Sequence, residues 1–172
     1  AFAEQLAQER GKRLGYIATS QAGDEEMRER IRRHQERRDA RWATLEESHS
    51  PSKLIAAQTL TAQYDVLLLD CMTVLISNII LRTPLDWDTA SQTDLLTLEE
   101  KVKTEVKALA AAAREFSGLC ILVANEVGFG IVPPSPLARF FRDCAGSSSQ
   151  YLAAQAEEVY LVVAGLPLCL KK

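Results

Sequence analysis

No pair of cysteines in this sequence has the spacing of a metal site. The four cysteines are Cys71, Cys120, Cys144 and Cys169, and because they form no C-x-x-C motif, a conventional zinc site is excluded. Cys120 and Cys169 lie in apolar runs, so we predict that they are small core residues. No apolar run approaches the roughly 20 residues of a membrane span, and nothing resembles a signal peptide. We therefore expect a protein of the reducing cytoplasm with no membrane span.

An excess of basic residues is also lacking. The 172 residues carry a net charge of −3, which argues against general nucleic-acid binding, since domains with that function are basic. Hydrophobic residues make up 47% of the chain, which is enough for a substantial core. We expect residues 1–172 to form one domain.

Apolar runs of strand length alternate with helical patterns along the chain. The strand-like runs are residues 14–18, 65–70, 119–124 and 158–164. Helical patterns cover residues 53–62, 71–78, 94–115 and 135–157, the last of them interrupted near Gly146. This alternation predicts an α/β fold with a mainly parallel sheet flanked by helices.

Positive charge is concentrated around a histidine between Arg28 and Arg41. This segment holds seven arginines and three acidic residues, a local net charge of +4. Helical spacing puts His34 on one arc with Met27 and Arg38. A neutral imidazole beside guanidinium groups is suited to attack a nucleotide phosphate, because the arginines hold and neutralise its oxygens. On these residues alone the alternative is a solvated arginine-rich helix face.

The apolar run 65–70 ends in an acidic residue, Asp70. P-loop enzymes carry the acid that holds Mg²⁺ or its water at the carboxyl end of such a strand. Ligands also bind at that edge of open α/β sheets. Asp70 is therefore a candidate metal-associated acid, although an aspartate after an apolar run is weak support by itself.

Two long motifs occur in the chain. The first begins at Tyr16 and reads Y-I-A-T-S-Q-x-x-D-x-E-M-x-x-R-I-x-x-H-x-x-x-R-x-x-x-W-x-T. The second begins at Asn125 and reads N-E-V-G-F-G-I-V-P, followed from Leu137 by L-A-R-F-F-R-D-C-A-G. In this order they resemble the motifs of the bifunctional adenosylcobinamide kinase/adenosylcobinamide-phosphate guanylyltransferases of cobalamin biosynthesis. The similarity covers essentially the whole chain.

The resemblance implies a fold, an activity and partners. The fold is that of a RecA-like P-loop NTPase. The implied enzyme uses ATP or GTP, with Mg²⁺, to phosphorylate the aminopropanol hydroxyl of the corrinoid adenosylcobinamide. It then transfers GMP from GTP to that phosphate through a guanylyl-histidine intermediate. A homo-oligomer, with a trimer favoured, is the implied assembly.

The resemblance also assigns site residues. His34 matches the guanylylated histidine, and Asp70 matches an acidic position linked to the active site. The positions matching nucleotide-binding residues are Ala18, Thr19, Ser20, Gln35, Glu36, Arg37, Arg38, Glu46 and Asp70. Glu46 closes a segment, residues 42–46, that is extended in the family, and on local grounds it reads equally well as an exposed carboxylate. Glu126 is a weaker candidate for a polar contact in the loop 125–134.

Two features depart from the family pattern. The family has a strand and a G-x-x-x-x-G-K-S phosphate loop just before its first helix, and these residues contain no such loop. We therefore expect the sequence to be truncated at its start. Ser149 stands where the family has Asn, which puts any contact made by that amide in doubt. Two alternatives remain: a P-loop small-molecule kinase without nucleotidyl transfer, and a non-catalytic relative.

Overall fold

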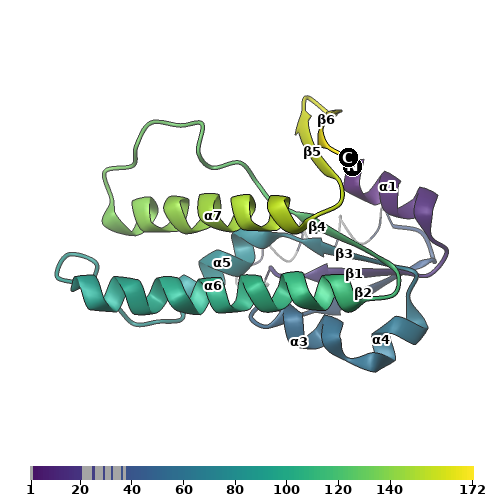
Figure 1. The fold of residues 1–172 in the computed structure, drawn as a ribbon, viewed down its shortest axis with the longest axis horizontal. Helices are drawn as coiled ribbons and strands as arrows, with labels where there is room; N and C mark the ends of the chain where they lie inside the picture. The colour runs from purple at the N-terminus through teal and green to yellow at the C-terminus, as the bar shows by residue number, and fades with distance from the viewer. Residues whose placement is uncertain (1, 21–24, 26–28, 30–31, 33–35, 37) are drawn as a thin grey trace.

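The computed structural model describes residues 2–20, 25, 29, 32, 36 and 38–172 (Figure 1). The helices are α1 (Phe2–Arg10), α3 (Pro51–Ala56), α4 (Gln58–Gln63), α5 (Met72–Leu81), α6 (Gln92–Glu115) and α7 (Pro136–Gln155). The strands are β1 (Leu14–Ala18), β2 (Trp42–Glu46), β3 (Val66–Asp70), β4 (Leu119–Val123), β5 (Val159–Val163) and β6 (Leu166–Lys171). Among the described residues, no helix combines the length and apolar character needed to cross a membrane.

The first four strands form one sheet in the order β2-β1-β3-β4, and every pairing in it is parallel. This confirms the predicted α/β fold with a parallel sheet. The two central strands are the most buried: β1 is buried along its whole length, and β3 is buried up to its last residue, Asp70. The predicted strand ending at residue 124 is β4, which is only partly buried because it lies at an edge of this sheet.

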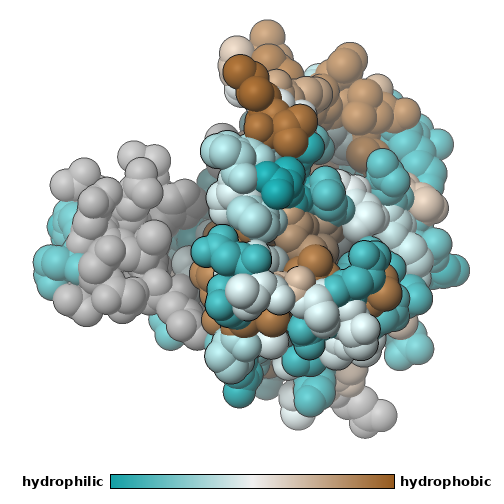
Figure 2. All heavy atoms as spheres, turned by 90° about the vertical axis from the view of Figure 1, so that its left-hand side faces the viewer, coloured by the Kyte–Doolittle hydropathy of each residue, from teal (hydrophilic) through white to brown (hydrophobic). Residues whose placement is uncertain are grey.

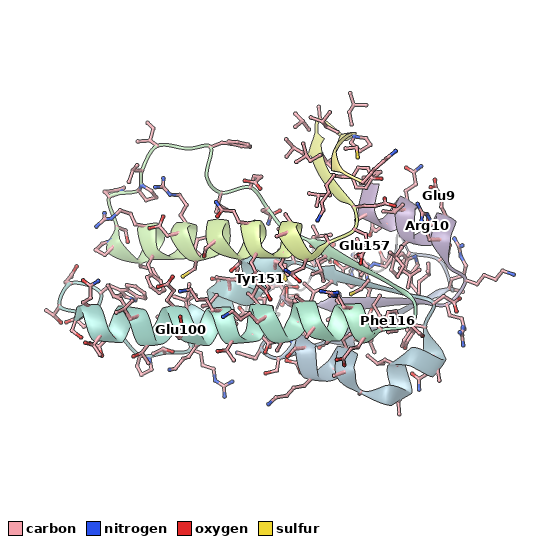
Figure 3. All side chains as sticks on the ribbon, viewed as in Figure 1. Glu9, Arg10, Glu100, Phe116, Tyr151 and Glu157 are labelled. Atoms are coloured by element: carbon pink, nitrogen blue, oxygen red, sulfur yellow. The ribbon has the colours of Figure 1, made fainter. Side chains whose placement is uncertain are left out.

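Helices cover both faces of the sheet (Figure 1). On one face α1 packs through Ala7 against Leu14 and Val66. On the other face α3, α4, α5, α6 and α7 enclose the main core, which includes Leu67 and Leu69 of β3. Phe116, just after α6, is buried in that core, whereas the outer side of α6 carries charged residues such as Glu100 (Figure 3). The amphipathic pattern of α6 thus fixes which of its faces meets the sheet layer.

Two helix predictions need correction. The stretch predicted as one helix over residues 53–62 is two helices, α3 and α4, because Ala57 between them is extended at φ −67° and ψ 119°. The predicted break near Gly146 is absent, since α7 runs through it without interruption. A single glycine costs a helix only about 1 kcal/mol. Burial of Cys144, Ala145 and Ser148 on the inner face of α7 offsets that cost.

The strand predicted over residues 158–164 is confirmed as β5, but the prediction that it is buried is wrong, since three of its residues are only partly buried and the last two are exposed. Strand β5 does not join the parallel sheet but pairs antiparallel with β6 in a separate hairpin. Ala164 and Gly165 connect the two strands with φ values of 52° and 81°, as a two-residue primed turn requires. Cys169, predicted to be a core residue, is exposed on this hairpin, and Cys120 is partly buried.

An ion pair ties the start of β1 to the start of β3. The Arg13 guanidinium donates to Asp65 Oδ1 at 2.6 and 3.1 Å, and the backbone N–H groups of Arg13 and Lys12 donate to Asp65 Oδ2. The Arg13 side chain and these two N–H groups lower the pKa of Asp65 to about 2. The two residues are 52 positions apart, so the contact requires the folded sheet.

We expect Asp65 to make folding stability sensitive to acid. Its folded pKa lies below the ordinary value of 3.8, so its contribution is present above about pH 4 and is lost as the pH falls toward 2. Urea unfolding between pH 6 and 2 should therefore show a shallower loss of stability for Asp65→Asn than for the wild type. Asp39→Asn is the matched control: Asp39 pairs with Arg41 only two residues away, and such a pair can persist in the unfolded chain. Identical slopes for wild type and Asp65→Asn would refute this prediction.

Candidate functional site

The carboxyl ends of the strands bring several predicted site residues into one row. Ala18 at the end of β1 pairs with Glu46 at the end of β2 on one side and with Asp70 at the end of β3 on the other. Asp70 in turn pairs with Val123 of β4. Neighbouring strands lie about 4.8 Å apart, so these positions share one sheet edge. Thr19 and Ser20 follow Ala18 directly at this edge.

Thr19 fixes the backbone that follows Asp70. Its side chain is fully buried, and its hydroxyl accepts from the Cys71 N–H at 2.8 Å and donates to the Cys71 carbonyl at 2.9 Å. The Thr19 N–H also donates to the Asp70 carbonyl at 3.2 Å. The peptide bond between Asp70 and Cys71 is cis. Thr19 therefore connects the ends of β1 and β3 by hydrogen bonds. Its hydroxyl both donates and accepts in this connection.

We expect Thr19→Val to destabilise the fold by about 1–3 kcal/mol, because the nearly isosteric change leaves the buried Cys71 N–H without its partner, whereas the Cys71 carbonyl still accepts from the Leu75 N–H at 3.1 Å. Urea or thermal unfolding measures the loss. Thr19→Ser retains the hydroxyl and should recover most of the stability. A Thr19→Val protein as stable as the wild type would contradict the assigned role of this hydroxyl.

Asn78 of α5 connects the segment after β2 to the end of β1 at this edge. Its amide donates to the Thr19 carbonyl at 2.8 Å and to the Ser48 carbonyl, just after β2, at 3.0 Å. On the β4 side, the Asn125 amide donates to Thr73 Oγ1 at 2.9 Å. The sequence analysis did not identify Asn78. Its signal is the presence of an amide in α5, whose other residues are apolar or carry small hydroxyls.

Tyr16 connects Asp70 to the segment that follows His34. The Tyr16 hydroxyl donates to Asp70 Oδ2 at 2.8 Å. Burial and the neighbouring Asp70 carboxylate raise the pKa of Tyr16 well above its usual range, so the hydroxyl remains a donor at neutral pH. The guanidinium carbon of Arg38 lies 3.2 Å from the centre of the Tyr16 ring. Tyr16 is a second residue that the sequence analysis missed, although it opens the first motif.

The remaining predicted residues divide into two groups. His34, Gln35 and Arg37 lie outside the described residues. Of the others, Ser20 is half-buried, Glu46 is exposed, and Glu36 is exposed and pairs with Arg32. Two residues noted along with the motifs lie elsewhere: Glu126 is exposed in the loop before α7, and Ser149 is half-buried within α7.

The Arg38 side chain lies on the face of the sheet that α1 covers. It is only 6% exposed, and its guanidinium faces Glu4 of α1 at 3.7 Å and Thr44 Oγ1 of β2 at 3.3 Å. Together with the Tyr16 ring, these contacts hold the side chain on the same side of the sheet as α1. A nucleotide contact made by Arg38 stays a prediction.

The sequence as a whole matches a known family. Residues 1–170 match the family described as cobinamide kinase / cobinamide phosphate guanyltransferase. The chain belongs to this family. The matched stretch spans all the described elements except the last residue of β6, so the sheet edge described above lies within it.

Curated relatives carry corresponding names. The bifunctional adenosylcobalamin biosynthesis protein CobU of Escherichia coli is 41% identical over 161 residues, covering 91% of this chain and 84% of the relative. The protein of the same name from Salmonella typhimurium matches to the same extent. The bifunctional adenosylcobalamin biosynthesis protein CobP of Pseudomonas aeruginosa is 40% identical over 173 residues, covering 99% of this chain and 89% of the relative.

The described residues fit one mode of Mg²⁺ binding. They contain no group of three or more histidine, cysteine, aspartate or glutamate side chains able to hold a metal ion by themselves. Mg²⁺ is commonly bound by one or two carboxylates together with substrate phosphates. In the described part of the chain, Asp70 Oδ2 accepts from Tyr16 and no residue donates to Oδ1. A member of this family could therefore offer Oδ1 to a metal ion shared with a nucleotide.

Proposed function

We propose that this protein phosphorylates adenosylcobinamide with ATP or GTP and then transfers GMP from GTP to the product, giving adenosylcobinamide-GDP. The observation that carries the proposal is the family match over residues 1–170. The single row formed by Ala18, Glu46 and Asp70 at one sheet edge supports it, because open α/β sheets bind nucleotides there.

We assign the covalent step to His34. A neutral ring nitrogen attacks the α-phosphorus of GTP, a P–N bond forms, and the bond to the β-phosphate breaks, releasing pyrophosphate. A phosphate oxygen of adenosylcobinamide phosphate then attacks the same phosphorus, and the P–N bond breaks to regenerate the imidazole. The net positive charge between Arg28 and Arg41 suits this chemistry, since guanidinium groups stabilise the charge on the transferring group.

We assign to Asp70 the role of the metal-associated acid. Mg²⁺ bound with a nucleotide would neutralise phosphate charge and favour in-line displacement. The contribution of this chain is a carboxylate held at the sheet edge by Tyr16, with Thr19 fixing the backbone beside it. A nucleotide would then lie against Ala18, Thr19 and Ser20 at the end of β1, with Glu46 at the end of the neighbouring strand.

Incubation of the full-length protein with α-labelled GTP tests the proposal. We expect an acid-labile label on His34, which adenosylcobinamide phosphate discharges as adenosylcobinamide-GDP. Phosphorylation of adenosylcobinamide without any protein label would instead indicate a small-molecule kinase that lacks nucleotidyl transfer. Absence of both reactions would indicate a non-catalytic relative and would overturn the proposal.

We further propose that the protein forms a homo-oligomer, with a trimer the assembly that the resemblance favours. Exposed apolar side chains support an assembly: Phe129 and Ile131 in the loop before α7 are 82% and 96% exposed, and Leu166 and Leu168 project from the hairpin. Apolar residues gather at the top of the face in Figure 2, at the height of this loop and hairpin in Figure 1. Light scattering on the purified protein would give the number of subunits.

We also propose a cytoplasmic location. All four cysteines are free thiols, and two of them, Cys71 and Cys144, are buried, as is usual in a reducing compartment. Fractionation of the producing cells would test this location.

A further inference from the structure

The Asp70 carboxylate has a specific hydrogen-bond donor on the neighbouring strand. Tyr16 and Asp70 lie on the same face of adjacent strands, two residues apart in register, since Asp70 pairs with Ala18. The Tyr16 ring is 7% exposed, packs in a small cluster with Ala18 and Leu68, and contacts Trp42 edge-on. The phenol group therefore cannot turn to water without leaving this cluster, and its 2.8 Å bond to Oδ2 fixes the rotation of the carboxylate.

The Tyr16 ring is in turn held from its other side. The Arg38 guanidinium stacks on the ring face at 3.2 Å, which is the geometry of a cation–π contact. Arg38 is only 6% exposed and is also engaged by Glu4 and Thr44, so the side chain is fixed by three elements. Arg38 lies four residues after His34 in the sequence. A continuous set of contacts thus joins Arg38 to the acid at the sheet edge.

A purely structural role for Tyr16 would use only its ring. The ring fills space between β1 and α1, and phenylalanine would do so equally well. The hydroxyl adds no packing, and its partner is the carboxylate that the proposed function assigns to metal binding. The Tyr16 hydroxyl binds Oδ2 and leaves Oδ1 without this donor. Because the hydrogen bond fixes the rotation of the carboxylate, it also fixes the direction in which Oδ1 points.

We propose that Tyr16 is a positioning residue that orients Asp70 for the metal–nucleotide complex and couples this carboxylate, through its ring, to Arg38. The inference rests on the proposed function, because it takes Asp70 to be the metal-associated acid. It goes further by assigning Tyr16 a role that it performs through Asp70, and Arg38 a role that it performs through the Tyr16 ring.

Tyr16→Phe tests the inference directly. The substitution keeps the ring and its contact with Arg38 but removes the donor to Oδ2. Loss of a partner that orients a metal-binding carboxylate commonly weakens metal binding on the order of 10-fold or more. We expect this weakening in Mn²⁺ titrations of full-length protein with GTP, followed by electron paramagnetic resonance. The Mg²⁺ concentration for half-maximal labelling of His34 should rise similarly, with the rate recovering at saturating Mg²⁺.

Tyr160→Phe is the matched control. Tyr160 also donates to a carboxylate, Glu158 at 2.7 Å, but on the separate hairpin, so its loss should leave the Mn²⁺ affinity unchanged. Arg38→Lys keeps the charge and loses the planar stack. It should weaken Mn²⁺ binding in the wild-type background and have a smaller effect in the Tyr16→Phe background.

Three results would overturn the inference or one part of it, and they are distinguishable. Suppose that the wild type becomes labelled at His34 and that Tyr16→Phe binds Mn²⁺ as tightly as the wild type does. This result would refute the positioning role and leave the proposed function intact. A wild type that shows neither labelling nor GTP-dependent Mn²⁺ binding refutes the proposed function, and the inference fails with it. Additive effects of Arg38→Lys and Tyr16→Phe would refute the coupling through the ring.

Discussion

Replacing His34 with alanine is expected to abolish guanylyl transfer while phosphorylation of adenosylcobinamide continues in the full-length protein. The imidazole is the proposed nucleophile, so its removal leaves no atom to form the P–N bond. Loss of a covalent nucleophile lowers the rate on the order of 10³-fold or more, and no label from α-labelled GTP should remain on the protein. The two half-reactions are measured separately, by protein labelling and by formation of adenosylcobinamide phosphate.

The chain provides its own control, because it has two histidines. His49 is half-buried in the turn after β2, where its Nδ1 lies 2.8 Å from Ser48 Oγ, and it matches no catalytic motif. His49→Ala should therefore still become labelled. Labelling that persists in His34→Ala and disappears in His49→Ala would move the nucleophile to His49 and refute the assignment made from the motif.

Asp70→Asn is expected to depress both reactions by about 10²-fold or more, because both use a nucleotide whose phosphate charge a metal ion would neutralise. Asparagine has nearly the same shape and can still accept from the Tyr16 hydroxyl through its amide oxygen. The change therefore removes the negative charge with little disturbance of packing. Steady-state rates of each reaction, measured across a range of Mg²⁺ concentrations, give the size of the effect.

Asp143→Asn is the matched control for Asp70→Asn. Asp143 lies on α7 with a side chain exposed to solvent, and its contact with Arg142 is long at 4.0 Å. Its rates and Mg²⁺ dependence should equal those of the wild type. If Asp70→Asn retained wild-type rates at limiting Mg²⁺, Asp70 would not be the metal-associated acid, whereas loss of one reaction alone would assign it to that reaction.

The two corrected predictions near the carboxyl terminus have a common physical cause. Gly146 and the apolar run 158–164 were interpreted from local sequence alone. A glycine weakens a helix by an amount that packing can offset, as the inner face of α7 shows through Cys144 and Ser148. An apolar run signals a strand but does not specify the partner strand, and here the positive φ values at Ala164 and Gly165 direct β5 back onto β6.

The sequence by itself determined the family, the alternation of strands and helices, and the row of candidate residues at strand ends. Apolar runs such as 66–70 are buried strands, and a terminal acid such as Asp70 must lie at the edge where parallel strands end. Periodicity and motifs are local properties, so they can be read along the chain without knowledge of its neighbours in space.

Only the tertiary structure decided which side chains act on one another across the sheet. Tyr16, Arg38 and Asp70 come from distant parts of the chain, and their contacts depend on strand register and on which face each side chain occupies. The same holds for Asn78, which reaches the ends of two strands from α5. A hydrogen bond or a stacked ring requires a geometry within fractions of an ångström, and only the packed sheet and helices fix positions that closely.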